Sequence, residues 1–167
     1  MTFRLATAAD VPALHALVER AYRGDAARAG WTHEADLLGG QRTDPEALVD
    51  MLADPAQSIL VTGDPIAGCV ALRRLGDRAY LGMLTVTPDD QARGLGRALL
   101  AAAEAMARGG GLAVVEMTVI RQRTELIAWY ERRGYALTGE TRPFPMDDPR
   151  SGLPRQSLSF VVLEKRL

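Results

Sequence analysis

The sequence predicts a single α/β domain, spanning residues 1–167, that is built on one mixed sheet. Two observations lead to this fold class. Runs of alternating or continuous apolar residues, typical of strands, are interleaved with runs whose apolar residues recur every three or four positions, typical of helices. The length of 167 residues suits one hydrophobic core and is short for two.

The first part of the chain predicts a strand and two helices. Residues 3–7 form a short strand, and residues 10–22 repeat apolar positions at helical spacing, with Asp10 as the expected cap. A second helix is expected over residues 43–55, because Asp44 and the proline after it match the cap and first position of a helix.

Three strands joined by short glycine-containing turns follow, so they are expected to pair antiparallel. The pattern then predicts a helix that begins at Gly94, a strand, a second helix and two closing strands. The strand, helix, strand order predicts a right-handed crossover between parallel strands. The predicted ranges are 58–63, 66–75 and 79–86 for the three strands, 112–119 for the parallel one, 124–133 for the last helix, and 135–140 and 156–167 for the closing strands.

Composition argues against several classes of function. The chain has 20 Lys plus Arg against 21 Asp plus Glu, so it lacks the basic excess typical of nucleic-acid binding. The most apolar run, residues 98–107, contains Glu104 and is too short to cross a bilayer, and Arg4 and Asp10 interrupt the start of the chain, where a signal peptide would be apolar. We expect a cytoplasmic protein with no nucleic-acid partner and no membrane partner.

The residues that bind metals best are scarce. The chain has one cysteine, Cys69, in a strand-like run where a small buried side chain is expected, and two histidines, His15 and His33, without partners at metal-site spacing. We therefore expect no metal, and any cofactor to be organic.

The turn before the helix at Gly94 contains two glycines, in "QARGLGRALL". A P-loop would need Lys and then Ser or Thr after the second glycine, where Arg97 and Ala98 stand. The dinucleotide-binding fingerprint would need a third glycine at Leu99. Two interpretations stay open: the glycines serve backbone conformation only, or the unpaired N–H groups of the first helical turn bind a phosphate.

This segment resembles the acetyl-CoA binding segment of the GNAT superfamily of N-acyltransferases, whose signature is Gln or Arg, two residues, Gly, one residue, and Gly or Ala. Here these are Gln91, Gly94 and Gly96. A second segment, "LIAWYERRGYALTGE", is similar to the family's later helix, where an aromatic pair including a tyrosine precedes a glycine and an aromatic residue. The order of elements along the whole chain fits as well. The resemblance implies a GNAT-like single α/β domain with a mixed central sheet of about seven strands and helices on both faces.

The resemblance also implies an N-acetyltransferase that uses acetyl-CoA as cosubstrate. Main-chain groups of Leu84 and Val86 are expected to hold the pantetheine arm in a slot where their strand splays from the next one. A backbone N–H near Val86 is expected to stabilise the oxyanion that forms when the amine attacks the thioester. Turn amides would hold the pyrophosphate, with charge added by Arg93 and Arg97. The cofactor-binding residues so expected are Leu84, Thr85, Val86, Gln91, Ala92, Arg93, Gly94, Leu95, Gly96 and Arg97.

An amine that attacks a thioester must lose a proton, and the departing thiolate must gain one. A phenol is acidic enough to protonate a thiolate of pKa about 8.5. Tyr130, which matches the family's tyrosine, is the expected acid, although a tyrosine in that apolar stripe also suits packing alone. Glu34 is the favoured base, with Glu116, His33, a water relay or no protein base as alternatives.

One position departs from the family. Arg123 stands where many members carry an asparagine that contacts the pantetheine, so that contact is in doubt. Acceptor specificity is expected in residues 24–42 and 141–155, which do not themselves identify the amine, a small molecule or a peptide. A homodimer is possible, since dimers are common in the family. A catalytically silent acyl-CoA binding or sensing domain is the alternative function, and a nucleotide-binding protein is disfavoured by the two failed motifs.

Overall fold

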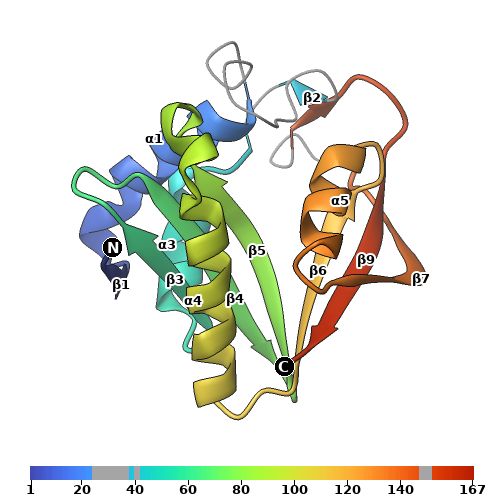
Figure 1. The fold of residues 1–167 in the computed structure, drawn as a ribbon. Coiled ribbons are helices and arrows are strands. Elements are labelled where there is room, and N and C mark those ends of the chain that lie inside the picture. Colours follow the sequence, from blue (N-terminus) through green and yellow to red (C-terminus); the bar gives the residue numbers. More distant parts are fainter. Residues whose placement is uncertain (24–37, 40–41, 147–151) are drawn as a thin grey trace.

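The computed structural model describes residues 1–23, 38–39, 42–146 and 152–167. Its centre is a seven-stranded mixed sheet with the strand order β1-β3-β4-β5-β6-β9-β7, which confirms the α/β class and the number of strands (Figure 1). The strands are β1 (Phe3–Leu5), β3 (Gln57–Thr62), β4 (Gly68–Leu75), β5 (Arg78–Val86), β6 (Val114–Ile120), β7 (Ala136–Pro143) and β9 (Ser159–Arg166).

Helices cover both faces of the sheet. Helices α1 (Val11–Tyr22) and α3 (Pro45–Ala53) pack on one face, and α4 (Leu95–Gly109) and α5 (Thr124–Glu131) lie on the other. The start of α3 is as predicted, because the Asp44 carboxylate accepts the N–H of Ala47 at 2.7 Å. Before α1 the Asp10 carboxylate instead accepts the Thr7 N–H and pairs with Arg4, both at 2.8 Å.

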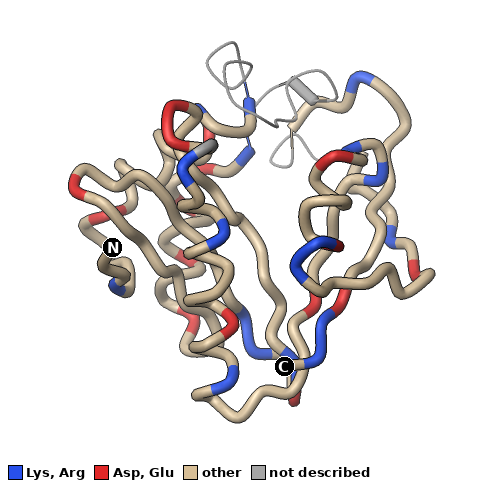
Figure 2. Tube along the Cα trace, viewed as in Figure 1, with Lys and Arg blue, Asp and Glu red and all other residues tan. Residues whose placement is uncertain are grey.

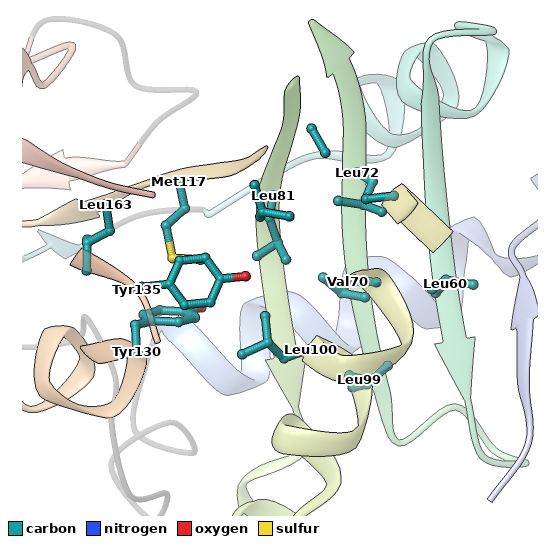
Figure 3. Close-up of a cluster of buried hydrophobic side chains, with 14 of the residues drawn as sticks. Leu60, Val70, Leu72, Leu81, Leu99, Leu100, Met117, Tyr130, Tyr135 and Leu163 are labelled. Atoms are coloured by element: carbon teal, nitrogen blue, oxygen red, sulfur yellow. The ribbon is translucent and has the colours of Figure 1, made fainter. Parts of the chain in front are cut away.

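Two hydrophobic cores separate these layers. The larger lies between the sheet and helices α4 and α5, and Figure 3 shows the side chains of Tyr130 and Tyr135 in it, projecting toward β5. The smaller lies under α1 and α3 and includes Cys69, which is fully buried, as the sequence predicted. Among the described residues, no helix is both long and apolar enough to span a membrane.

A second, two-stranded sheet joins two segments that the sequence analysis treated as irregular. Strand β2 (Leu38–Gly39) pairs antiparallel with β8 (Leu153–Pro154), although more than a hundred positions separate them in the sequence. A ladder of two residues has no periodic pattern that a sequence could show. The pairing brings together parts of both segments that are expected to govern acceptor specificity.

The sheet splits between its two central strands. Strands β5 and β6 pair with each other, in parallel, only over Arg78–Tyr80 and Val114–Glu116. Beyond these residues β5 continues to Val86 and β6 to Ile120, and the two strands no longer pair with each other. Each strand keeps its outer neighbour, since β4 follows β5 to its end and β9 follows β6 (Figure 1). The parallel crossover through α4 and the splay of the two strands are therefore both as expected.

Candidate active site

A cavity of about 360 Å³ lies where β5 and β6 separate. Residues 82–84 of β5 and 117–120 of β6 form its walls, together with Tyr22 of α1 and Tyr130 of α5. Four elements, from α1 near the start of the chain to α5 more than a hundred residues later, thus converge on one space, which is the arrangement expected of a ligand site.

The backbone of β5 bulges beside this cavity. Cys69 of β4 faces Thr85 while Ala71 faces Gly82, so two residues of β5 lie opposite one of β4. Met83, inside the bulge, has φ of 54°, a left-handed conformation that is rare for a side chain with a Cβ. The Thr85 hydroxyl donates to the Met83 carbonyl at 2.9 Å and so helps to hold this backbone in place.

Two protein side chains already use carbonyls at the end of β5. The Tyr22 hydroxyl donates to the Leu84 carbonyl, and Gln91 Nε2 donates to the Val86 carbonyl at 3.3 Å. The expected main-chain bonds from Leu84 and Val86 to a ligand are therefore restricted to the N–H groups and to the second lone pair of each carbonyl. Gln91, part of the expected signature, connects the turn to the strand.

The two glycines of the turn differ in what they require. Gly94 has φ of 77°, in the left-handed region, and open space where a Cβ would lie, so backbone conformation explains this glycine. Gly96 lies inside α4 without a positive φ, and a Cβ there would meet Val86 Cγ2 at 3.6 Å and Trp129 Cζ2 at 3.8 Å, ordinary contacts. Neither conformation nor protein packing explains Gly96, which points to close approach of a ligand.

The turn presents N–H groups in the way an anion requires. A 3-10 segment, Pro88–Arg93, leads into Gly94, and an α-helical hydrogen bond crosses the junction from the Ala98 N–H to the Gly94 carbonyl at 3.1 Å. The amides of residues 95–97 precede that bond and have no acceptor one turn earlier in α4. Arg93 pairs with Asp90 at 3.2 Å, whereas Arg97 lies exposed at the other side of the turn.

Tyr130 lines the cavity and is otherwise buried, with 5% of its surface exposed. Its ring makes edge-on contacts with Trp129 and Tyr135, at centroid distances of 5.1 and 5.7 Å. Burial raises the pKa of the Tyr130 hydroxyl well above its usual value, Tyr22 raises it further, and only Arg123 opposes this. The hydroxyl therefore stays protonated at neutral pH and can donate a hydrogen bond or a proton.

Arg123 is buried in the cavity wall, at 6% exposure, just before α5 begins. Its guanidinium lies 5.5 Å from the centre of the Tyr22 ring. Sequence analysis identified this arginine only as a departure from the family pattern. Tyr22 and the bulge at Met83 were missed altogether, because both act through contacts between elements.

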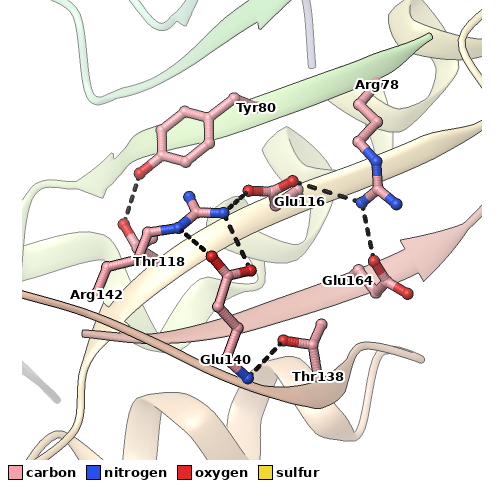
Figure 4. A network of polar contacts seen from close by, with 8 residues as sticks. All are labelled: Arg78, Tyr80, Glu116, Thr118, Thr138, Glu140, Arg142 and Glu164. Carbon is pink, nitrogen blue, oxygen red and sulfur yellow. Dashed lines mark hydrogen bonds and ion pairs between the residues drawn. The ribbon is translucent and has the colours of Figure 1, made fainter. Parts of the chain in front are cut away.

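Of the three side chains considered as the base, the structure describes only Glu116. Glu34 and His33 lie outside the described residues. Glu116 is held between two arginines, with Arg142 Nη2 at 2.6 Å from Oε1 and Arg78 Nη1 at 3.4 Å from Oε2 (Figure 4). Both oxygens of Glu116 are thus engaged, and Glu116 is not among the residues that line the cavity. We therefore do not propose Glu116 as the base.

The described part of the chain contains no group of three or more His, Cys, Asp or Glu side chains that could hold a metal ion. What it offers instead is a helix start whose first amides have no acceptor within the helix, a slot between two strands and a protonated phenol beside that slot. This arrangement can bind an elongated ligand with a phosphate at one end and supply a proton at the other.

Comparison with known proteins agrees with this geometry. A sequence model described as the acetyltransferase (GNAT) family matches residues 13–135, well over half of the chain. A search of curated proteins found none that matches the sequence.

Solved structures resemble most or all of the chain. Ribosomal-protein-S18-alanine N-acetyltransferase of Escherichia coli is 20% identical over 99% of this chain and 92% of its own, with a TM-score of 0.71. Ribosomal-protein-alanine N-acetyltransferase of Brucella melitensis is 21% identical over 100% of both chains, with a TM-score of 0.72. A Bacillus anthracis protein named as a streptothricin acetyltransferase, solved with acetyl coenzyme A, is 17% identical over 71% of this chain and 67% of its own, with a TM-score of 0.58. At these identities the likeness shows the fold.

Proposed function

The chain belongs to the acetyltransferase (GNAT) family, and we propose that it transfers the acetyl group of acetyl-CoA to an amine that attacks the thioester directly. The family uses acetyl-CoA, and the chain is an acetyltransferase by its family and fold. One observation carries the proposal furthest: the slot between β5 and β6 lies between the start of α4, whose first amides have no acceptor within the helix, and a cavity wall that contains Tyr130.

Acetyl-CoA would span this slot. Its pyrophosphate would lie on the amides of residues 92–97 at the start of α4, with Gly96 leaving room for it. Its pantetheine arm would run between the separated strands beside residues 84–86, and its thioester would lie in the cavity near Tyr130. The cofactor-binding set expected from the sequence is therefore retained as one site.

The reaction requires two proton movements. As the amine nitrogen bonds to the carbonyl carbon, the carbon–sulfur bond breaks and the sulfur leaves with the electron pair. We infer that Tyr130 donates its proton to that thiolate, since its raised pKa keeps the phenol protonated. An N–H near Val86 would stabilise the oxyanion, and Glu34 remains our proposed acceptor of the amine proton.

We propose that the acceptor amine belongs to a small molecule or to a peptide. The structural neighbours carry names that specify an alanine of a ribosomal protein and streptothricin, so the same fold serves protein and small-molecule acceptors. The paired segments β2 and β8 belong to the two stretches where we expect specificity to lie.

Release of thiol from acetyl-CoA, measured against a panel of amines, amino acids and peptides, tests the proposal. We expect at least one acceptor to accelerate release, with formation of an N-acetyl product by mass spectrometry. Binding of acetyl-CoA without turnover across a broad panel would instead support a silent acyl-CoA binding domain.

The role of Tyr130 is tested with the accepted amine. Tyr130→Phe should lower kcat by about a hundredfold, at the lower end of the range for general acid catalysis, and leave the Kd for acetyl-CoA within about twofold. Tyr135→Phe is the matched control, because it removes another phenol from the same aromatic cluster, one that donates to Glu104 at 3.1 Å. Equal kcat values for the two variants would remove Tyr130 from the mechanism.

A further inference from the structure

A second pocket, of about 480 Å³, lies between α4 and the end of α5. Its lining carries four cationic side chains and one carboxylate among the described residues: Arg97, Arg132, Arg133, Lys165 and Glu104. Figure 2 shows Lys and Arg segments on both sides of the gap between α4 and α5.

The single carboxylate does not neutralise the arginines. Glu104, 7% exposed, accepts from Lys165 Nζ at 3.0 Å with both oxygens and from the Tyr135 hydroxyl at 3.1 Å. Its charge is therefore matched by Lys165. Within the part of the chain that the structure describes, no ion pair is found for Arg97, Arg132 or Arg133.

Arg133 is fixed in place but incompletely satisfied. Its Nη1 donates to the Trp129 carbonyl at 2.8 Å, and its guanidinium stacks 3.8 Å above the Trp129 ring. Its Nε is buried and has no hydrogen-bond partner. Burial lowers the pKa of Arg133, and the charges of Arg132 and Arg97 lower it further, so the three cations repel one another.

The pocket is continuous with the glycine turn. Arg97 belongs both to the first turn of α4 and to the pocket lining. The Trp129 ring that supports Arg133 also lies 3.8 Å from where a Cβ of Gly96 would be. A ligand with its pyrophosphate on the turn amides would therefore place its next groups at this pocket.

We propose that the pocket formed by Arg97, Arg132 and Arg133 binds a phosphate monoester, the 3′-phosphate on the ribose of acetyl-CoA, and selects the coenzyme over its 3′-dephospho form. The inference rests on the proposed function. A phosphate monoester carries close to two negative charges at neutral pH, and arginine forks bind its oxygens through paired hydrogen bonds. Such a ligand relieves the repulsion among the three cations.

Calorimetric titration of the full chain with acetyl-CoA and with 3′-dephospho-acetyl-CoA tests this. We expect the dephospho form to bind at least tenfold more weakly, with a preference that shrinks as salt concentration rises. The double variant Arg97→Gln, Arg132→Gln should lose most of the preference by weakening acetyl-CoA binding alone. Arg108→Gln, an exposed arginine of the same helix, is the matched control and should keep the preference.

The outcomes separate the two proposals. Equal affinities for the two ligands in the native chain would overturn the 3′-phosphate assignment while leaving the proposed acetyltransferase function intact. Failure to bind either ligand would contradict the proposed function itself. Competition by inorganic phosphate as strong as that by adenosine 3′,5′-bisphosphate would show a general anion site and would also overturn the assignment.

Discussion

The burial of Tyr130 has a consequence for the pH dependence of the reaction. Its pKa is raised above the ordinary value of 10, so the phenol stays protonated throughout the range in which an amine of pKa about 10.4 becomes a nucleophile. We expect kcat/KM to rise with pH up to about 9.5, without a descending limb from loss of the acid.

Steady-state rates between pH 6 and 9.5 with the accepted amine test this expectation, and Tyr130→Phe should lower the whole curve without changing its shape. A descending limb below pH 9.5 that disappears in Tyr130→Phe would show that the phenol ionises within the working range. It would contradict the burial argument.

Replacing each of the two glycines of the turn by alanine should affect a different property, stability at Gly94 and acetyl-CoA binding at Gly96. Gly94→Ala places a Cβ at φ of 77° and should cost about 1–2 kcal/mol of stability. Gly96→Ala meets only ordinary contacts and improves helix propensity, so stability should be unchanged or slightly higher. Its Cβ should nevertheless weaken acetyl-CoA binding by at least about tenfold, because it covers the turn amides.

Thermal unfolding and calorimetric titration of both glycine variants separate these effects. The result that would count against a phosphate cradle is Gly96→Ala with native affinity for acetyl-CoA. In that case the glycines would serve the turn and nothing else.

At the scale of elements, local patterns predicted what depends on neighbours in sequence. The start of α3 follows from Asp44 and Pro45, and its cap forms as expected. The bulge at Met83 depends on where β4 aligns with β5 and on bonds from other elements, and no local pattern marks it. The β2–β8 pair and the pocket formed by Arg97, Arg132 and Arg133 could not be predicted for the same reason, because each depends on contacts between segments that are distant in sequence.

The arginine pair around Glu116 should stabilise four strands without taking part in the chemistry. Arg78 bridges Glu116 to Glu164 of β9 at 2.9 Å, and Arg142 joins β7 to β6. Glu116→Gln leaves two guanidinium groups without their shared carboxylate and should cost about 1–3 kcal/mol. Its kcat should stay within about twofold of the native value.

The matched control is Glu140→Gln, because Glu140 is half exposed and contacts only one of these arginines, Arg142 at 3.0 Å. This change should cost at most about 1 kcal/mol. Urea unfolding gives both stabilities. A large loss of kcat in folded Glu116→Gln would restore Glu116 as a candidate base.

On the scale of the molecule, the sheet behaves as two halves joined along a short ladder. The first half ends at β5 and carries α4, and the second begins at β6 and carries α5. Only Arg78–Tyr80 and Val114–Glu116 pair across the junction, so the open part of the slot lacks the main-chain bonds that normally hold adjacent strands. A ligand that contacts both halves can supply contacts that the protein alone does not make there.

Acetyl-CoA should therefore stabilise the whole fold and slow hydrogen exchange in both halves together. At a hundred times its Kd it should add about 2.7 kcal/mol, and residues 82–86 of β5 and 117–120 of β6 should be protected in parallel. Adenosine 3′,5′-bisphosphate, which lacks the pantetheine arm, should protect the start of α4 and leave both strand ends unchanged. If acetyl-CoA protected only the start of α4, the arm would not lie in the slot, because an arm between the strands necessarily shields the amides that face it.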